Sequence, residues 1–323
     1  MSKKDNTYHH YVPFCYLKQF GHKINKDPKE FFVYCFDKIN GKTYPKNIRK
    51  ICGENFFYNL CPESCENNML NPLSIERDYF AKSVEPHLSK LLNYLNGTAK
   101  KCFYNNINTF PSTGNIRFQI AWHLVIQALR LPTVREFEIE SSEAIIPKML
   151  DVLKNLVANI EPDSSFKDRD IKVNYDHALI HAQTSFMNSN LIQSFVKVMC
   201  DKFWAFMYSP RGEFMTCDCP ILVKQHMPNA RPTHLGLSQY GSELFFVISP
   251  YLAIHLLDKE YFEFSNDNDD FIFGESTEDG IKRINLLNFC LAQRYIINHN
   301  NNFSFIKQLY NTPIYEKDED GKP

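Results

Sequence analysis

Residues 112–131 contain the feature that most limits how this chain can fold. Ser112 or Thr113 can cap a helix at its start, and Pro132 ends it. Apolar residues cover most of its circumference, which is typical of a helix at the centre of a domain. They are Ile116, Phe118, Ile120, Trp122, Leu124, Val125, Ile126 and Leu129. We therefore expect a domain packed around this helix.

One narrow stripe of the same helix is polar. Asn115, Gln119, His123, Gln127 and Arg130 follow one another at steps of four, four, four and three, which places them on one face. This polar stripe could simply face solvent, or it could line a cavity. Solvent-facing stripes usually carry Glu and Lys, and this one carries amides, an imidazole and one guanidinium. Gln119, His123, Gln127 and Arg130 are therefore candidate substrate-binding residues.

The remaining patterns predict an α+β fold. Helical periodicity covers 73–96, 134–158, 174–200 and 280–298. A break or kink is expected at Pro86, and Pro147 could divide its helix into two pieces. Asn40-Gly41 predicts an N-terminal hairpin of strands 30–37 and 42–48. Further strands are expected at 203–208, 214–216, 221–223, 244–248 and 252–256. We expect a helix-rich centre, an N-terminal hairpin and a C-terminal antiparallel β segment.

The domain organisation follows from composition and length. A chain of 323 residues with 44% hydrophobic residues can form one large domain, which we place at 9–315. The polar loop 161–170 is a candidate subdomain boundary, and residues 1–8 and 316–323 are expected to be flexible ends. The sequence shows no secretory leader and no apolar run long enough to span a membrane. We expect a cytoplasmic protein with reduced cysteines and no membrane partner.

Charge is balanced overall but not locally. The net charge of -1 gives no general preference for nucleic acid, yet residues 1–50 hold eleven Lys or Arg against four acids. This basic N-terminal region could follow a phosphate backbone, or it could be a solvated face. The phosphate-binding GxxxxGK, dinucleotide GxGxxG, esterase GxSxG and zinc-protease HExxH motifs are all absent. Their absence argues against those four enzyme classes.

The motif His9-His10-Tyr11-Val12-Pro13 is the strongest candidate for chemistry. Pro13 opens a short amphipathic helix that stops at Gly21, so the two histidines lie just before a helix N-terminus. The field there favours neutral rings, which can act as bases or metal ligands. Neighbouring residues point apart, so a divalent metal would need further ligands from His123 or from acids, and the cofactor is unknown.

Three other positions complete the set of candidates. Asp218, in the Cys217–Pro220 turn, could face the histidines or could only bond local backbone. Glu76 could pair with Glu85, although nine residues on an unbroken α-helix place them on opposite faces. Arg130 and Arg135 could clamp a phosphate or carboxylate, or could form structural contacts.

The chain resembles a bacterial family called domain of unknown function 4238. The resemblance rests first on His9–Pro13, with Tyr16-Leu17 and Phe20. It continues, in order, in Val33-Tyr34, Glu54-x-x-Phe57-Tyr58, Ile75-Glu76, Leu129-Arg130-x-Pro132-x-x-Arg135, Asp218-x-Pro220 and Ile248-Ser249-Pro250. Cys217 and Cys219 replace the small polar residues expected around the Asp-Pro turn. The resemblance implies an α+β fold and transfers no activity.

Two functional hypotheses follow. The first is a nuclease-like or phosphoryl-transfer enzyme of toxin or phage-defence type. Its base or metal ligand would be His9 or His10, its carboxylates Asp218 and Glu76. Tyr11, the polar stripe and Arg135 would hold substrate, and nucleic acid could contact the basic N-terminal region. The second is a non-catalytic module that senses a ligand or binds a protein. The two differ in whether these residues converge in one pocket.

Overall fold

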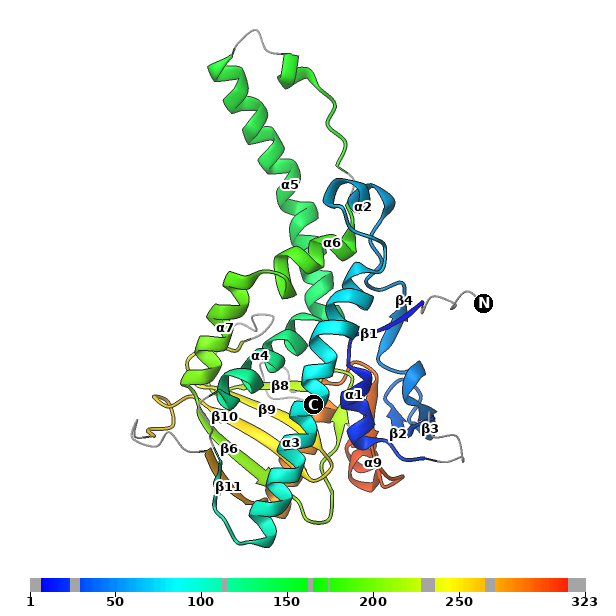
Figure 1. The fold of residues 1–323 in the computed structure, drawn as a ribbon, viewed down its shortest axis with the longest axis vertical. Coiled ribbons are helices and arrows are strands. Elements are labelled where there is room, and N and C mark those ends of the chain that lie inside the picture. The colour runs from blue at the N-terminus through cyan, green and yellow to red at the C-terminus, as the bar shows by residue number, and fades with distance from the viewer. Residues whose placement is uncertain are drawn as a thin grey trace, which may run out of the picture.

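The computed structural model describes residues 7–23, 30–111, 115–161, 165–173, 175–227, 236–264 and 271–312. Its central helix is α4 (Ile116–Leu129), which lies beside α3 (Glu85–Tyr104) over a large twisted sheet (Figure 1). Every α4 residue from 123 to 129 is buried, as are Ile116, Ile120 and Ala121. The expectation of a central helix is therefore confirmed.

The large sheet has six strands in the order β5-β11-β6-β10-β9-β8. Their bounds are β5 (Thr109–Phe110), β6 (Phe203–Tyr208), β8 (Ile221–Gln225), β9 (Ser242–Ser249), β10 (Leu252–Leu257) and β11 (Phe271–Glu275). Neighbours are antiparallel except for β6 and β11, which are parallel. All eight residues of β9 are buried, so this strand lies in the interior.

Two smaller sheets accompany it, and the four-stranded one joins strands from the two ends of the chain. One has the order β3-β2-β12-β7 and the other pairs β1 with β4. Their strands are β1 (Tyr8–His10), β2 (Phe32–Asp37), β3 (Lys42–Asn47), β4 (Gly53–Asn55), β7 (Thr216–Cys217) and β12 (Tyr295–Asn298). The expected N-terminal hairpin is present as β2 and β3, and Gly41 at its turn has a φ of 67°. The chain is α+β, as predicted.

Helices account for most of the remaining chain. They are α1 (Phe14–Leu17), α2 (Pro62–Asn68), α5 (Pro132–Ile160), α6 (His177–His181), α7 (Ser189–Asp201), α8 (Glu278–Leu291) and α9 (Ser304–Asn311). The described residues also include three 3-10 segments, Lys18–Phe20, Ile48–Lys50 and Ser165–Asp168, and two π-helical segments, Ser74–Val84 and Ala182–Phe186. No described helix combines the length and apolar character that a membrane span requires.

Several predicted helix boundaries were wrong. Pro86 causes no break, because it lies in the first turn of α3, where its missing N–H removes no bond within that helix. Pro147 leaves α5 continuous. The helix predicted to reach residue 298 ends at Leu291, and the apolar run beginning at Tyr295 forms β12 between β2 and β7. All four β12 residues are buried, so pairing with two strands outweighs the helical pattern.

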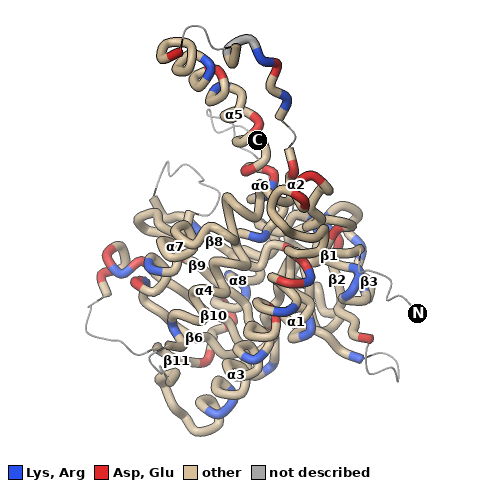
Figure 2. The backbone as a smooth tube through the Cα atoms, turned by 45° about the horizontal axis from the view of Figure 1, so that its top comes forward, with Lys and Arg blue, Asp and Glu red and all other residues tan. Residues whose placement is uncertain are grey.

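Helix α5 projects from the body of the molecule (Figure 1), and both signs of charge occur along it (Figure 2). The predicted boundary at 161–170 falls at its far end, where Ser165–Asp168 forms a 3-10 turn and residues 162–164 lie outside the described part. Tyr8, assigned to a flexible start, is already part of β1. Residues 1–6 and the predicted flexible tail at 316–323 lie outside the described residues.

Candidate functional site

The two motif histidines are held in β1 by hydrogen bonds to backbone groups. Nδ1 of His9, which is fully buried, accepts from the backbone N–H of Tyr58 at 3.0 Å. Nε2 of His10 donates to the carbonyl oxygen of Ile48 at 3.0 Å. Burial lowers the pKa of His10 to about 4, and the charge of Arg130 acts in the same direction. The ring is neutral at pH 7 as expected, but the main cause is burial rather than a helix dipole.

Arg130 lies at the centre of the contacts made by this motif. Its side chain is only 1% exposed. The guanidinium donates to the carbonyl oxygen of His10, to Glu85 Oε1 at 3.3 Å and to the hydroxyl of Tyr58 at 3.3 Å. Its central carbon lies 3.9 Å from the centre of the Phe80 ring. These partners fix the motif backbone and leave the guanidinium directed into the protein rather than toward solvent.

Glu76 lies near Arg130 because the segment before α3 is π-helical. A π-helix has about 4.4 residues per turn, so nine residues make close to two turns. Glu76 and Glu85 therefore share a face, contrary to the expectation from α-helical geometry, and they interact electrostatically. Oε2 of Glu76 is buried and has no hydrogen-bond partner. Burial raises the pKa of Glu76 to about 7, with Arg130 opposing and Glu85 reinforcing the rise.

This raised pKa predicts a pH-dependent contribution to stability. Glu76 stays protonated up to about pH 7 in the folded protein, whereas the ordinary pKa of a glutamate is 4.5. The folded state therefore holds the extra proton between these values, and the free energy of unfolding falls as pH rises through this window. In Glu76→Gln this decrease should be absent. As pH rises through the window, the free energy of unfolding of the variant should therefore increase relative to that of the native protein by up to about 1.4 kcal/mol per pH unit.

Urea unfolding of both proteins at pH 5, 6 and 7 measures the effect as a difference between them. Other groups that titrate in this range contribute equally to both and cancel. A stability difference that stays constant over the window would show that Glu76 is already ionised in the folded protein.

Arg135 does not join the Arg130 cluster as half of a clamp. Its guanidinium carbon lies 4.3 Å from the centre of the Phe57 ring. Burial lowers the pKa of Arg135, and the negative charge of Glu54 is the largest opposing influence. The two arginines thus contact different aromatic rings of the core, and their main charge partners are different carboxylates.

Asp218 ties β12 to the turn that follows β7. Its carboxylate accepts backbone N–H bonds from Gln293, Arg294 and Tyr295 at 2.9, 2.8 and 2.9 Å. The residue is 2% exposed, and burial raises its pKa against the effect of these donors. Within the described part of the chain, no hydrogen bond links Asp218 to Arg130 or to the paired histidines.

The basic N-terminal region contributes to the fold through several of its cations. Nζ of Lys38 donates to two carbonyl oxygens at the C-terminal end of α8, both at 2.7 Å. Lys46 donates to the hydroxyl of Tyr295 at 2.8 Å, and Arg49 lies over the Phe14 ring at 4.8 Å. Four further lysines lie outside the described residues: Lys3, Lys4, Lys26 and Lys29.

The polar stripe of α4 divides into two halves with different contacts. Toward its C-terminal end, Gln127 donates to the carbonyl oxygen of Tyr11 at 3.1 Å and Arg130 donates to that of His10. Toward its N-terminal end, Gln119 and His123 line a pocket. One half therefore holds the N-terminal motif, and the other half faces a cavity.

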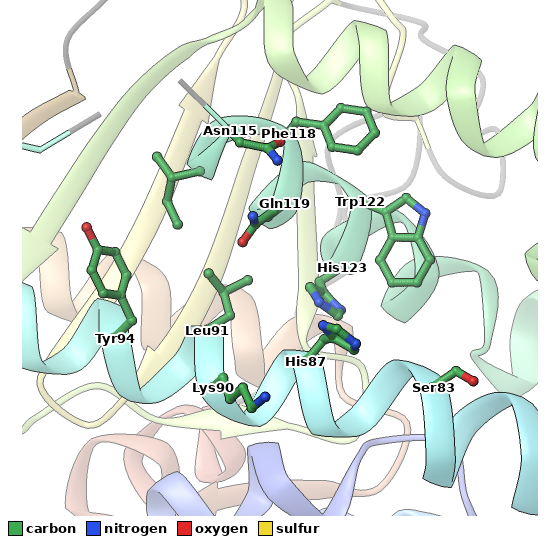
Figure 3. Close-up of a pocket in the computed structure, with 11 residues that line it drawn as sticks. Ser83, His87, Lys90, Leu91, Tyr94, Asn115, Phe118, Gln119, Trp122 and His123 are labelled. Atoms are coloured by element: carbon green, nitrogen blue, oxygen red, sulfur yellow. The ribbon is translucent and has the colours of Figure 1, made fainter. Parts of the chain in front are cut away.

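This α3–α4 pocket has a volume of about 730 Å³ and lies between the two helices (Figure 3). Its lining residues are Ser83, His87, Lys90, Leu91, Tyr94, Asn115, Ile116, Phe118, Gln119, Trp122 and His123. The rings of His87, from α3, and His123, from α4, lie next to each other across it (Figure 3). The His123 ring also meets Trp122 edge-on, with centroids 4.9 Å apart.

The electrostatics of the pocket favour an anion. Burial lowers the pKa of His123 to about 4, and His87 lowers it further, so His123 is neutral at pH 7. Its Nδ1 is buried and lacks a hydrogen-bond partner. None of the described residues that line the pocket is Asp or Glu, and Lys90 supplies a positive charge. Across the described ranges, no three His, Cys, Asp or Glu side chains are placed to hold a metal ion.

Comparison with known families places the chain. A family model described as a protein of unknown function (DUF4238) matches residues 8–302. The chain belongs to the DUF4238 family. The match begins at the His-His motif and includes both the Arg130 cluster and the α3–α4 pocket. Neither the curated proteins nor the solved structures contain a match to it.

Sequence reasoning missed one wall of the pocket in this DUF4238 protein. His87, Lys90 and Tyr94 lie three and four residues apart, so α3 presents them on one face. That spacing was available in the sequence. It was obscured because Pro86 suggested that the helix breaks just before His87.

Proposed function

We propose that the α3–α4 pocket binds a small anionic ligand that carries an aromatic ring, of the nucleotide class. The lining carries this proposal: Lys90 offers a cation, Trp122 and Tyr94 offer rings, and the described lining residues include no carboxylate. The volume of about 730 Å³ is in the range of pockets for small molecules and cofactors. This is the ligand-sensing alternative drawn from the sequence, with its site specified.

An unsatisfied group in the pocket wall supports the same proposal. His123 is 8% exposed, and its Nδ1 has no partner. A buried polar atom left without a hydrogen bond costs about 1–3 kcal/mol, which a ligand group could recover on binding. The amide of Gln119 lines the pocket one turn away, so a ligand there can meet two polar groups of α4.

Titration calorimetry with nucleosides and their 5′-mono- and triphosphates tests this proposal. Lys90→Ala should weaken binding of a phosphorylated ligand at least about tenfold, because a charge-assisted hydrogen bond contributes about 1.5–3 kcal/mol. The matched control is Lys101→Ala, which removes an exposed lysine of the same helix outside the pocket. Equal affinity for nucleosides and for their phosphates would contradict the proposal. So would an affinity that Lys101→Ala lowers as much as Lys90→Ala does.

We also propose a nuclease-like, phosphoryl-transfer function in which the general acid and base are residues of the α3–α4 pocket instead of His10 and Asp218. His10 and Asp218 already bond backbone groups, whereas His87 and His123 both line the pocket. Neutral His123 would take the proton of a ribose 2′-hydroxyl while the 2′-oxygen attacks the phosphorus. His87 would give a proton to the departing 5′-oxygen, and Lys90 would offset the charge on the phosphate. The products would be a 2′,3′-cyclic phosphate and a free 5′-hydroxyl.

Labelled RNA and DNA, each incubated with the protein in EDTA and in a divalent metal, separate the two proposals. Cleavage of RNA alone in EDTA, abolished by His123→Ala and retained by Lys101→Ala, would support catalysis. Nucleotide binding without cleavage would leave the ligand-binding proposal standing alone. Cleavage that requires metal would contradict the roles given to the two histidines.

The biological setting belongs to this second proposal. An RNA-cleaving site would suit a toxin or phage-defence enzyme. Arrest of growth on expression, if it is lost in His123→Ala, would support that role.

We also propose that the protein is cytoplasmic. All ten cysteines are free, as thiols are in a reducing compartment.

A further inference from the structure

The two imidazoles of the α3–α4 pocket lie beside each other without an acidic partner. His87 is exposed on α3, and the ring of His123 lies next to it from α4 (Figure 3). Among the described lining residues, the only other side chains that can carry a charge are Lys90 and Tyr94, both on α3. The lining therefore offers a site for a proton but no anion to stabilise it.

The acids that precede His87 in the sequence are engaged with other cations. The carboxylate of Glu85 accepts from Arg130 at 3.3 Å, and that of Asp78 forms an ion pair with Lys82. A negative charge within about 4–6 Å favours the protonated form of an imidazole. A ligand that brings negative charge into the pocket would therefore supply the partner that a proton on His87 lacks.

We propose that the pocket binds a phosphate group together with one proton, which His87 holds. This proton site rests on the proposed function of the pocket and adds a dependence on pH. Lys90 lies three residues from His87 on the same face of α3, so one phosphate can contact both cations. His123 remains the neutral member of the pair, because its burial and a protonated His87 both oppose a second charge.

Proton linkage gives the direction of the pH effect. Because the complex would hold more protons than the free protein and the free ligand, affinity should fall as pH rises. An imidazole ordinarily titrates near pH 6.5, and a phosphate that shifts this by about one unit or more would cause uptake of about half a proton or more at pH 7. Between pH 7 and pH 8.5 the dissociation constant should then rise about three- to sixfold. A phosphate monoester is largely dianionic over this range, so the ligand contributes little to the change.

Titration calorimetry of adenosine 5′-phosphate at pH 7, in two buffers with different ionisation enthalpies, counts the protons taken up on binding. The native protein should take up about half a proton or more per ligand, and His87→Gln should take up almost none. His123→Gln should bind the ligand more weakly and still take up the proton. Adenosine, which lacks the phosphate, should bind without proton uptake.

The matched control is His177→Gln, which removes an exposed histidine of α6 outside the pocket. It should leave the affinity and the proton uptake unchanged. Circular dichroism checks that His87→Gln is folded, as expected for an exposed position. Binding without proton uptake, or uptake that persists in His87→Gln, would overturn the proton site and leave the ligand-binding proposal standing. Absence of binding at every pH would overturn both.

Discussion

Replacing Arg130 by methionine should lower the free energy of unfolding by about 3–5 kcal/mol, the range for removing one partner of a buried ion pair. The guanidinium holds the carbonyl oxygen of His10 and the carboxylate of Glu85, and it stacks on Phe80. Methionine keeps much of the apolar packing, so the loss reports mainly the polar contacts. Urea unfolding followed by tryptophan fluorescence measures it.

Two further variants show whether the loss comes from that network. Adding Glu85→Gln to Arg130→Met should destabilise less than the sum of the single changes, because the carboxylate then no longer lacks its partner. Arg135→Met should cost less than Arg130→Met, since Arg135 is only partly buried and its aromatic contact is with Phe57. A loss below about 1 kcal/mol for Arg130→Met would contradict a structural role for the cluster.

Asp218→Ala should be the other strongly destabilising change, by at least about 3 kcal/mol, because it leaves one buried and two partly buried N–H groups without their acceptor. Asp218→Asn should cost less, since one amide oxygen can still accept. The melting temperature and the urea midpoint measure both effects. A stability equal to that of the native protein in either assay would show that the carboxylate does not join β7 to β12.

The part of the fold nearest to α4 could be predicted from the sequence. A helix that is apolar on most faces must be enclosed, and its amide-rich stripe pointed to something other than solvent. The two halves of that stripe could not be told apart, because Gln119 and Gln127 are the same residue type. Only the tertiary structure decides that one lines a pocket and the other holds Tyr11.

Other features depend on choices that local patterns do not specify. A π-helical segment brings Glu76 and Glu85 to one face, and the α-helical spacing of apolar residues in the sequence does not predict it. Likewise β12 is a strand because it pairs with β2 and β7, which come from distant parts of the chain. Its apolar residues also suited the end of a helix, so long-range pairing decided the outcome.

The His9–Pro13 motif is therefore distinguished from the site that we propose. His9 and His10 are bonded to the backbone in β1, whereas His87 and His123 line a cavity of ligand size. In this account the paired histidines and Arg130 hold α4 in place, and α4 presents His123 to the pocket. The motif supports the site without touching the ligand.

Parallel titration of one phosphorylated nucleotide into His123→Ala and Asp218→Asn tests this division most directly. Both variants are measured at a temperature where circular dichroism shows them to be folded. We predict that His123→Ala weakens binding about tenfold, the effect of losing one hydrogen bond of about 1.4 kcal/mol, while Asp218→Asn binds like the native protein. Weakened binding in Asp218→Asn with native affinity in His123→Ala would contradict the account and place the ligand at the Asp218 turn instead of the α3–α4 pocket.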